Sequence, residues 1–226
     1  MVPQPEPPDA PPGPQHLAAT RFLDAGHPDV VGFARRVTAG AATETQRAAR
    51  LFAAVRDGLR YDPYTCSADP GDYVASTVLG QGQGYCIPKS VVLAAAARAV
   101  GIPARLGFAD VRNHLQSERL LEAMGTDLFV FHGYAELHVG GAWRKASCAF
   151  NRELCERFSV APLEFDGAGD ALLHAFSGDG RRYMEYVHQR GSYADLPLGE
   201  ILAGLEETYP GFLMRAGRAD DPAFGA

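Results

Sequence analysis

The feature that most constrains the fold is a segment that predicts a helix with no polar face. Every residue from Val91 to Ala97 is apolar, so a helix over this stretch presents apolar side chains in all directions. Pro88 suits its first turn, where a missing N–H costs nothing, and Gly101 suits the position after its end. Such a helix is stable only when other elements surround it. We therefore expect the chain to fold around a central helix that begins at Cys86.

Cys86 stands where a glycine-rich loop gives way to this helix. Unpaired backbone N–H groups and the positive end of the helix dipole favour thiolate over thiol there, so we interpret Cys86 as a nucleophile. The simpler alternative is a buried structural cysteine. The other cysteines, Cys66, Cys148 and Cys155, form no Cys-x-x-Cys pair and show no metal-ligand spacing, and we expect them to be reduced.

A histidine on a later strand is the expected base. His132 opens a strand-like run that ends at the only tryptophan, Trp143. His138 lies on the same strand face, so periodicity alone does not choose between the two histidines. His138 also stands beside the expected hairpin turn, where a solvated side chain is the simpler interpretation. A cysteine at a helix start with a histidine on a later strand is the layout of papain-like nucleophilic catalysis.

These motifs resemble those of the transglutaminase-like superfamily. The matching segments are Gly84–Cys86, Arg98–Arg105, His132–Glu136 and Trp143. The resemblance covers residues 43–151 and favours His132 as the base. It implies an α+β fold with a papain-like or transglutaminase-like core, in which a central helix packs on an antiparallel sheet, with helical N- and C-terminal additions. It also implies that no metal or organic cofactor is required.

The third catalytic position departs from this family, which implies an aspartate four residues after the tryptophan. Ser147 stands there, and a serine can accept the imidazole N–H but cannot stabilise an imidazolium with a full charge. Pairing the expected hairpin about Gly140-Gly141 makes Ser147 and Asn151 diagonal neighbours of His132. Asn151 is also suited to cap the following helix. A carboxylate from beyond the core, with Asp166 the best placed, is a third option.

The candidates for binding substrate are Gln83, Tyr85, Tyr134 and Glu136. Tyr85 precedes the nucleophile and is expected to line the pocket, and Gln83 could add a side-chain amide to the backbone oxyanion donors. Glu136 is expected to support the site rather than react. Arg105 is expected to brace the fold through an ion pair.

The chain is expected to form a single domain with a tail at each end. Residues 1–15, rich in proline, are expected to be a disordered tail, and residues 216–226 a loose one. The domain would span residues 16–215, with its core at 43–151 and a C-terminal extension at 152–215 that shapes the substrate pocket. The patterns predict helices over 28–37, 43–59, 152–158, 183–189 and 198–208, a short helix after Ser117, a strand over 106–109, and a hairpin of strands 128–139 and 142–150.

Composition excludes several classes of function. The net charge of −6 argues against a nucleic-acid-binding protein. The sequence contains no apolar run of the roughly 18 residues needed to span a bilayer, and the first residues lack the features of a secretory signal. We expect a cytoplasmic protein that binds neither nucleic acid nor membrane, and the sequence leaves its oligomeric state open.

The expected chemistry is acyl transfer through an acyl-enzyme thioester. His132 would take the proton from Cys86, and the sulfur would attack an amide, ester or thioester carbonyl of a peptide, a protein or a small acyl substrate. Water as acceptor gives hydrolysis, and an amine gives transamidation or amide synthesis. The main alternative is a non-catalytic binding or scaffold protein on the same fold, which the missing aspartate favours and the retained cysteine and histidine disfavour.

Overall fold

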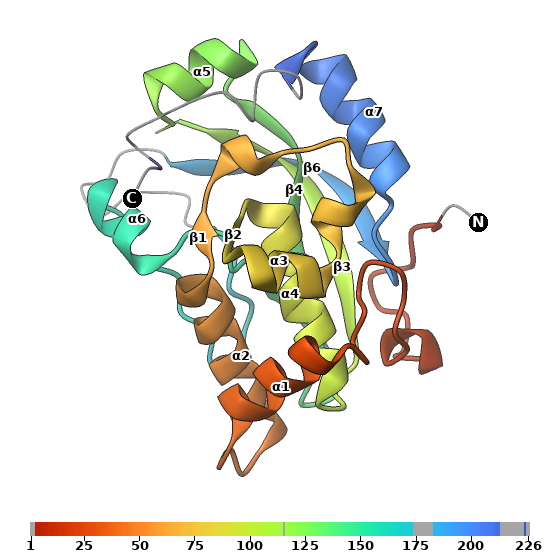
Figure 1. The fold of residues 1–226 in the computed structure, drawn as a ribbon. Helices are drawn as coiled ribbons and strands as arrows, with labels where there is room; N and C mark the ends of the chain where they lie inside the picture. The colour runs from red at the N-terminus through yellow and green to blue at the C-terminus, as the bar shows by residue number, and fades with distance from the viewer. Residues whose placement is uncertain (1–2, 115, 174–182, 213–223, 225–226) are drawn as a thin grey trace.

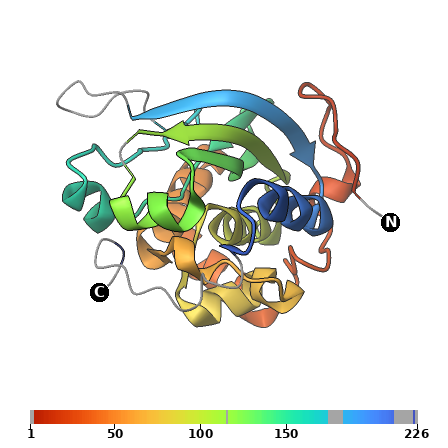
Figure 2. The same ribbon diagram turned by 90° about the horizontal axis from the view of Figure 1, so that it is seen from above.

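The computed structural model describes residues 3–114, 116–173, 183–212 and 224. A four-stranded antiparallel sheet in the order β5-β4-β3-β6 lies on one side of the helix α4 (Cys86–Ala99), and helices α1, α2 and α3 lie on its other side (Figures 1 and 2). The sheet strands are β3 (Ala104–Asn113), β4 (Leu128–Val139), β5 (Ala142–Ala146) and β6 (Met184–Tyr193). The expected α+β fold, with a central helix on an antiparallel sheet, is confirmed.

The remaining elements surround this core. Three α-helices precede α4: α1 (Pro28–Thr38), α2 (Glu44–Gly58) and α3 (Ala75–Gln81). Within the described residues, three follow β3: α5 (Glu118–Met124), α6 (Arg152–Arg157) and α7 (Leu198–Thr208). Two short parallel strands, β1 (Arg60–Tyr61) and β2 (Gln83–Gly84), pair beside α4, and the 3-10 helices are Pro14–His16, Pro63–Thr65 and Pro70–Tyr73.

Helix α4 is the centre of the core, as its all-apolar sequence predicts. All of its residues from Cys86 to Arg98 are buried. Its last turn is fixed by Arg98, whose guanidinium donates hydrogen bonds to the carbonyl oxygens of Ala104 (2.7 Å), Ala18 (2.7 Å) and Ala194 (2.5 Å). One buried arginine therefore joins the end of the helix to three segments that lie far apart in the sequence.

The expected hairpin is confirmed in position and in register. Gly140 and Gly141 connect β4 to β5 with φ of 61° and 83°, the left-handed conformation that a two-residue type I′ turn requires. Val139 pairs with Ala142, and Ala135 pairs with Ala146. Strand β5 ends at Ala146, sooner than expected, because Ser147 donates its N–H to Ala171 at 2.8 Å instead of to β4.

The prediction of a helix over residues 183–189 is wrong, because this segment forms part of strand β6. Strand β6 pairs antiparallel with β3 along its whole length. Short stretches with mixed periodicity suit either helix or strand, and the free edge of β3 decides the outcome here. The sheet is thus completed by a segment from the expected C-terminal extension, whereas the helix expected over 198–208 is confirmed as α7.

The proline-rich N-terminal segment differs from the disordered tail that its composition suggests. Glu6 donates its N–H to Ser192 of β6 at 2.7 Å, and Trp143 of β5 donates its indole N–H to Ala10 at 2.7 Å. Arg105 donates to the carbonyls of Pro7 and Pro8 at 3.2 and 2.6 Å. Hydrogen bonds to backbone carbonyls hold this segment against the sheet, and burial of apolar side chains does not. The composition of the segment therefore does not predict its ordered structure.

The other expected tail, residues 216–226, lies outside the described residues except for Phe224. The ring of Phe224 is buried and lies 6.0 Å from the rings of Tyr61 and Phe158.

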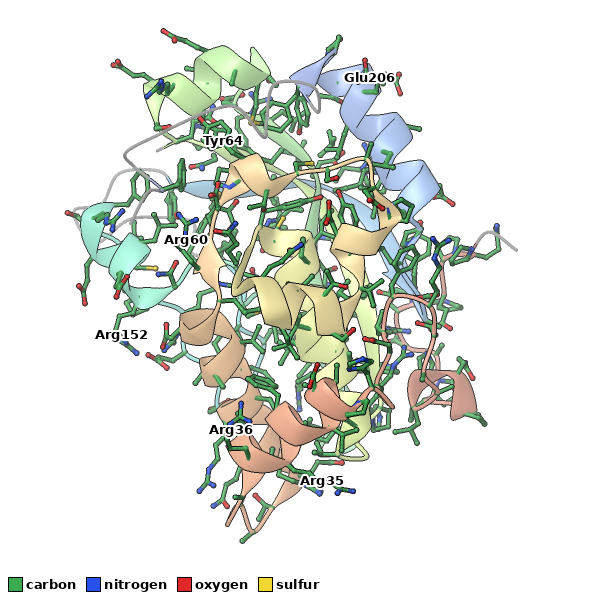
Figure 3. All side chains as sticks on the ribbon, in the orientation of Figure 1. Arg35, Arg36, Arg60, Tyr64, Arg152 and Glu206 are labelled. Atoms are coloured by element: carbon green, nitrogen blue, oxygen red, sulfur yellow. The ribbon has the colours of Figure 1, made fainter. Side chains whose placement is uncertain are left out.

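The surface of the helical layer is charged, as Arg35 and Arg36 on α1 illustrate (Figure 3). Across the described ranges, every helix is too short or too polar to cross a bilayer.

The ion pair expected of Arg105 is confirmed and yields a stability prediction. Its Nε donates to Glu136 Oε2 at 2.5 Å, both side chains are buried, and the guanidinium lies 4.3 Å from the centre of the Trp143 ring. Replacing Arg105 by methionine leaves Glu136 buried without its main partner, so we expect the unfolding free energy in urea to fall by about 3–5 kcal/mol. Arg35→Met on the exposed face of α1 should change it by less than about 0.5 kcal/mol. Equal losses in the two variants would contradict this role.

Candidate active site

The N-terminus of α4 meets β4 at Gly133. A Cβ at this position would lie 3.2 Å from the Cα of Ile87 and 3.1 Å from its Cγ1, so any larger residue would push the start of the helix away from the strand. The backbone N–H of Gly133 acts on the sulfur of Cys86 and opposes the rise in the pKa of its thiol. Because His132 precedes Gly133 on the strand, the contact also brings the expected base beside the expected nucleophile. Both residues line one small cavity of about 50 Å³.

His132 has Ser147 as its hydrogen-bond partner. Its Nε2 lies 3.2 Å from Ser147 Oγ, and both side chains are buried. Ser147 is the first residue after β5 and, in the register of the hairpin, a diagonal neighbour of His132. A neutral imidazole that donates from Nε2 to the serine keeps the Nδ1 lone pair free to accept a proton.

The two alternative partners of His132 have other roles. Asn151 accepts the backbone N–H of Tyr61 at 3.2 Å, and its side chain does not cap α6. Asp166 is exposed and accepts the N–H groups of Ala168 and Gly169 at 2.8 and 3.1 Å, which closes a local turn. Of the three residues expected to orient the base, the structure brings Ser147 to it.

Burial favours the neutral forms of both Cys86 and His132. Desolvation raises the pKa of the Cys86 thiol to about 12, against the opposing effect of hydrogen bonds from Gly133 and Ile87. Desolvation also lowers the pKa of His132 to about 4. The helix start therefore does not give the thiolate that the sequence suggests, because the loss of water outweighs the N–H groups and the dipole.

The cavity beside Cys86 is lined almost entirely by apolar and aromatic side chains. They come from several elements and include Tyr61, Tyr85, Met124, Phe129, Phe131 and Tyr209. Met124 of α5 and Tyr209 at the end of α7 contribute to the lining, and Figure 1 shows these two helices near each other at the same end of the molecule. Tyr85 lines the cavity as expected, and its hydroxyl is fixed 2.9 Å from that of Tyr73. No motif points to the other lining residues, because what they share is burial beside the cysteine and not a sequence pattern.

The other expected substrate-binding residues lie elsewhere. Gln83 of β2 accepts a hydrogen bond from Arg60, its pairing partner on β1, and the side chain of Arg60 is labelled in Figure 3. Tyr134 donates to Gln189 at 3.1 Å and Glu136 pairs with Arg105, and both line a second cavity of about 670 Å³ beneath the N-terminal segment. Glu136 thus supports the sheet and the N-terminal segment, and the structure does not bring it to Cys86.

A comparison with known families identifies the superfamily of this chain. The family model of the transglutaminase-like superfamily matches residues 31–148, more than half of the chain. The chain belongs to this superfamily.

A search of curated proteins finds no match to this chain. Among solved structures, a candidate cysteine protease from Cytophaga hutchinsonii is 15% identical, with a TM-score of 0.44 and coverage of 59% of this chain and 40% of that one. A candidate protease from Parabacteroides distasonis is 16% identical, with a TM-score of 0.39 and coverage of 56% and 24%. This chain thus spans less than half the length of either protein.

The buried neutral imidazole predicts a specific dependence of stability on pH. His132 takes up its proton at pH 6.5 when unfolded but only at about pH 4 when folded, so its contribution is complete above pH 6.5 and is lost as the pH falls through 4. The loss should reach about 3 kcal/mol of unfolding free energy. In urea titrations between pH 7 and 4, His132→Gln should be less acid-sensitive than wild type by this amount, whereas His188→Gln at an exposed position should match wild type. Equal acid sensitivity of all three proteins would refute a buried neutral His132.

Proposed function

We propose that this protein is a cysteine-dependent acyltransferase or hydrolase that works through an acyl-enzyme thioester. The observation that carries the proposal is the placement of Cys86 and His132 on one cavity, with His132 Nε2 held by Ser147 at 3.2 Å. Membership of the transglutaminase-like superfamily supports it.

Because burial disfavours the charged forms of Cys86 and His132, proton transfer during attack is favoured over a preformed ion pair. His132 accepts the thiol proton at Nδ1 while the Cys86 sulfur bonds to the carbonyl carbon, and the backbone N–H of Cys86 stabilises the oxyanion. The tetrahedral intermediate collapses to the thioester, and the imidazolium returns its proton to the leaving group. Water or an amine then takes the acyl group, with His132 again as base.

The partner of His132 bears on which substrates react. Ser147 orients the ring but adds no negative charge to stabilise the imidazolium. We therefore propose thioesters and esters, whose leaving groups need less assistance than an amide nitrogen, as the preferred acyl donors. Among the residues that the structure describes, the cavity lining contains no carboxylate, lysine or arginine, so a charged acyl group would be buried there without a partner. The proposed acyl group is uncharged.

A non-catalytic binding protein remains the second candidate, and one observation favours it. The side chains of Cys86 and His132 are only 8% and 5% exposed, so an acyl donor must enter by displacing part of the cavity wall. A protein whose cavity wall never moves aside would have this fold but could not carry out acyl transfer.

Trapping the acyl-enzyme tests the proposal. Incubated with the phenyl thioester of butyric acid, the wild type should gain one butyryl group by intact mass, and hydroxylamine should remove it. Cys86→Ala should abolish the adduct, and His132→Gln should slow its formation by about 10²–10⁴-fold because the general base is lost. Cys155→Ala, which removes another buried cysteine, should leave the rate unchanged. An adduct that persists in Cys86→Ala, or none in the wild type, would refute the proposal.

A further inference from the structure

Strand β3 is flanked by irregularities on both of its neighbours, and they lie on either side of Asp110 and directly opposite it. On β4, Val130 and Phe131 together oppose Asp110, since Ala109 pairs with His132 and Val111 pairs with Phe129. On β6, Arg190 is the extra residue of a second bulge, because Phe108 pairs with Gly191 and Ala109 pairs with Gln189. Bulges redirect nearby side chains and concentrate beside active sites.

The bulge on β4 contains a strained residue directly before the proposed base. Phe131 has a φ of 54°, the left-handed region that residues other than glycine rarely adopt. Such a conformation persists only where the surroundings impose it.

Side chains satisfy both backbone N–H groups that the bulge removes from the sheet. Tyr209 Oη accepts the N–H of Val130 at 2.5 Å, and Asp110 Oδ1 accepts the N–H of Phe131 at 3.1 Å. Asp110, itself 7% exposed, also accepts Arg190 Nε at 2.5 Å. The strained peptide is therefore anchored to a buried carboxylate that is fixed by a charge-assisted hydrogen bond.

The ring of Phe131 is enclosed on two sides. The guanidinium of Arg190 lies 4.2 Å from its centre, and a Cβ at Gly204 of α7 would lie 2.7 Å from its Cε2. Arg190 thus contacts both the ring of Phe131 and the carboxylate that accepts its N–H, which opposes relaxation of the bulge to regular strand geometry.

We propose that Asp110 and Arg190 are positioning residues for acyl transfer, an inference that rests on the proposed function. By holding Phe131 in the left-handed conformation, they direct His132, the next residue, and the N–H of Gly133 toward Cys86. Neither Asp110 nor Arg190 lines the cavity, so they act through the β4 backbone. Without them, β4 regains regular pairing at this point and His132 turns away from the sulfur.

The test compares rates of Cys86 butyrylation by the thioester in full-length variants that remain folded at the assay temperature. Asp110→Ala removes the acceptor for Phe131 and should slow maximal acylation about 10–100-fold through misplacement of the base. The thioester concentration at half-maximal rate should change little, since the cavity lining is intact. Asp110→Asn keeps an acceptor oxygen and should recover most of the rate.

The matched control is Asp127→Ala, which breaks an ion pair with Arg112 beside the same strands and should acylate like wild type. Arg190→Gln provides an independent variant should Asp110→Ala fail to fold, and it should slow maximal acylation about tenfold.

Two outcomes distinguish failure of the positioning role from failure of the proposed function. A folded Asp110→Ala or Arg190→Gln protein that acylates at the wild-type rate overturns the positioning role and leaves the proposed function intact. Wild-type protein that forms no adduct overturns both.

Discussion

The close approach of α4 to β4 at Gly133 is the contact on which the rest of the structure depends. It joins the start of the most buried helix to the strand that carries His132, so closely that a Cβ at Gly133 would crowd Ile87. The sheet, the α1–α3 layer and the buried Arg98 all serve to hold this helix in place. The contact also delivers a strand N–H to the Cys86 sulfur, so the packing that stabilises the core and the geometry of the proposed reaction have the same origin.

Burial at this contact has a cost as well as a benefit. It excludes water, which strengthens hydrogen bonds to the reacting atoms, but it also disfavours the charged forms of both Cys86 and His132. A carboxylate beside the imidazole would offset part of this penalty, and Ser147 does not. The site therefore resembles a general-base arrangement, in which charge develops only as the thiol attacks. This resting state fits a protein that reacts with activated acyl donors and is inert without them.

Local signals in the sequence predicted the elements that depend on local physics. The apolar run gave α4, the Gly140-Gly141 pair gave the hairpin, and its register placed Ser147 beside His132. Strand β6 was missed because its identity depends on the free edge of β3. The order of the N-terminal segment is not evident from its composition, because the side chains of a buried arginine and a half-buried tryptophan bind its carbonyls. The bulge at Phe131 has no sequence signal, since phenylalanine has no preference for positive φ.

The central claim is that His132 is neutral at rest, donates from Nε2 to Ser147 and presents Nδ1 as the base. Side-chain ¹⁵N NMR between pH 5 and 8, with the His132 signals assigned by His132→Gln, tests this claim most directly. The account predicts a neutral ring protonated on Nε2 throughout this range, because its pKa is lowered to about 4. An imidazolium at pH 7, paired with a Cys86 thiolate, would contradict it.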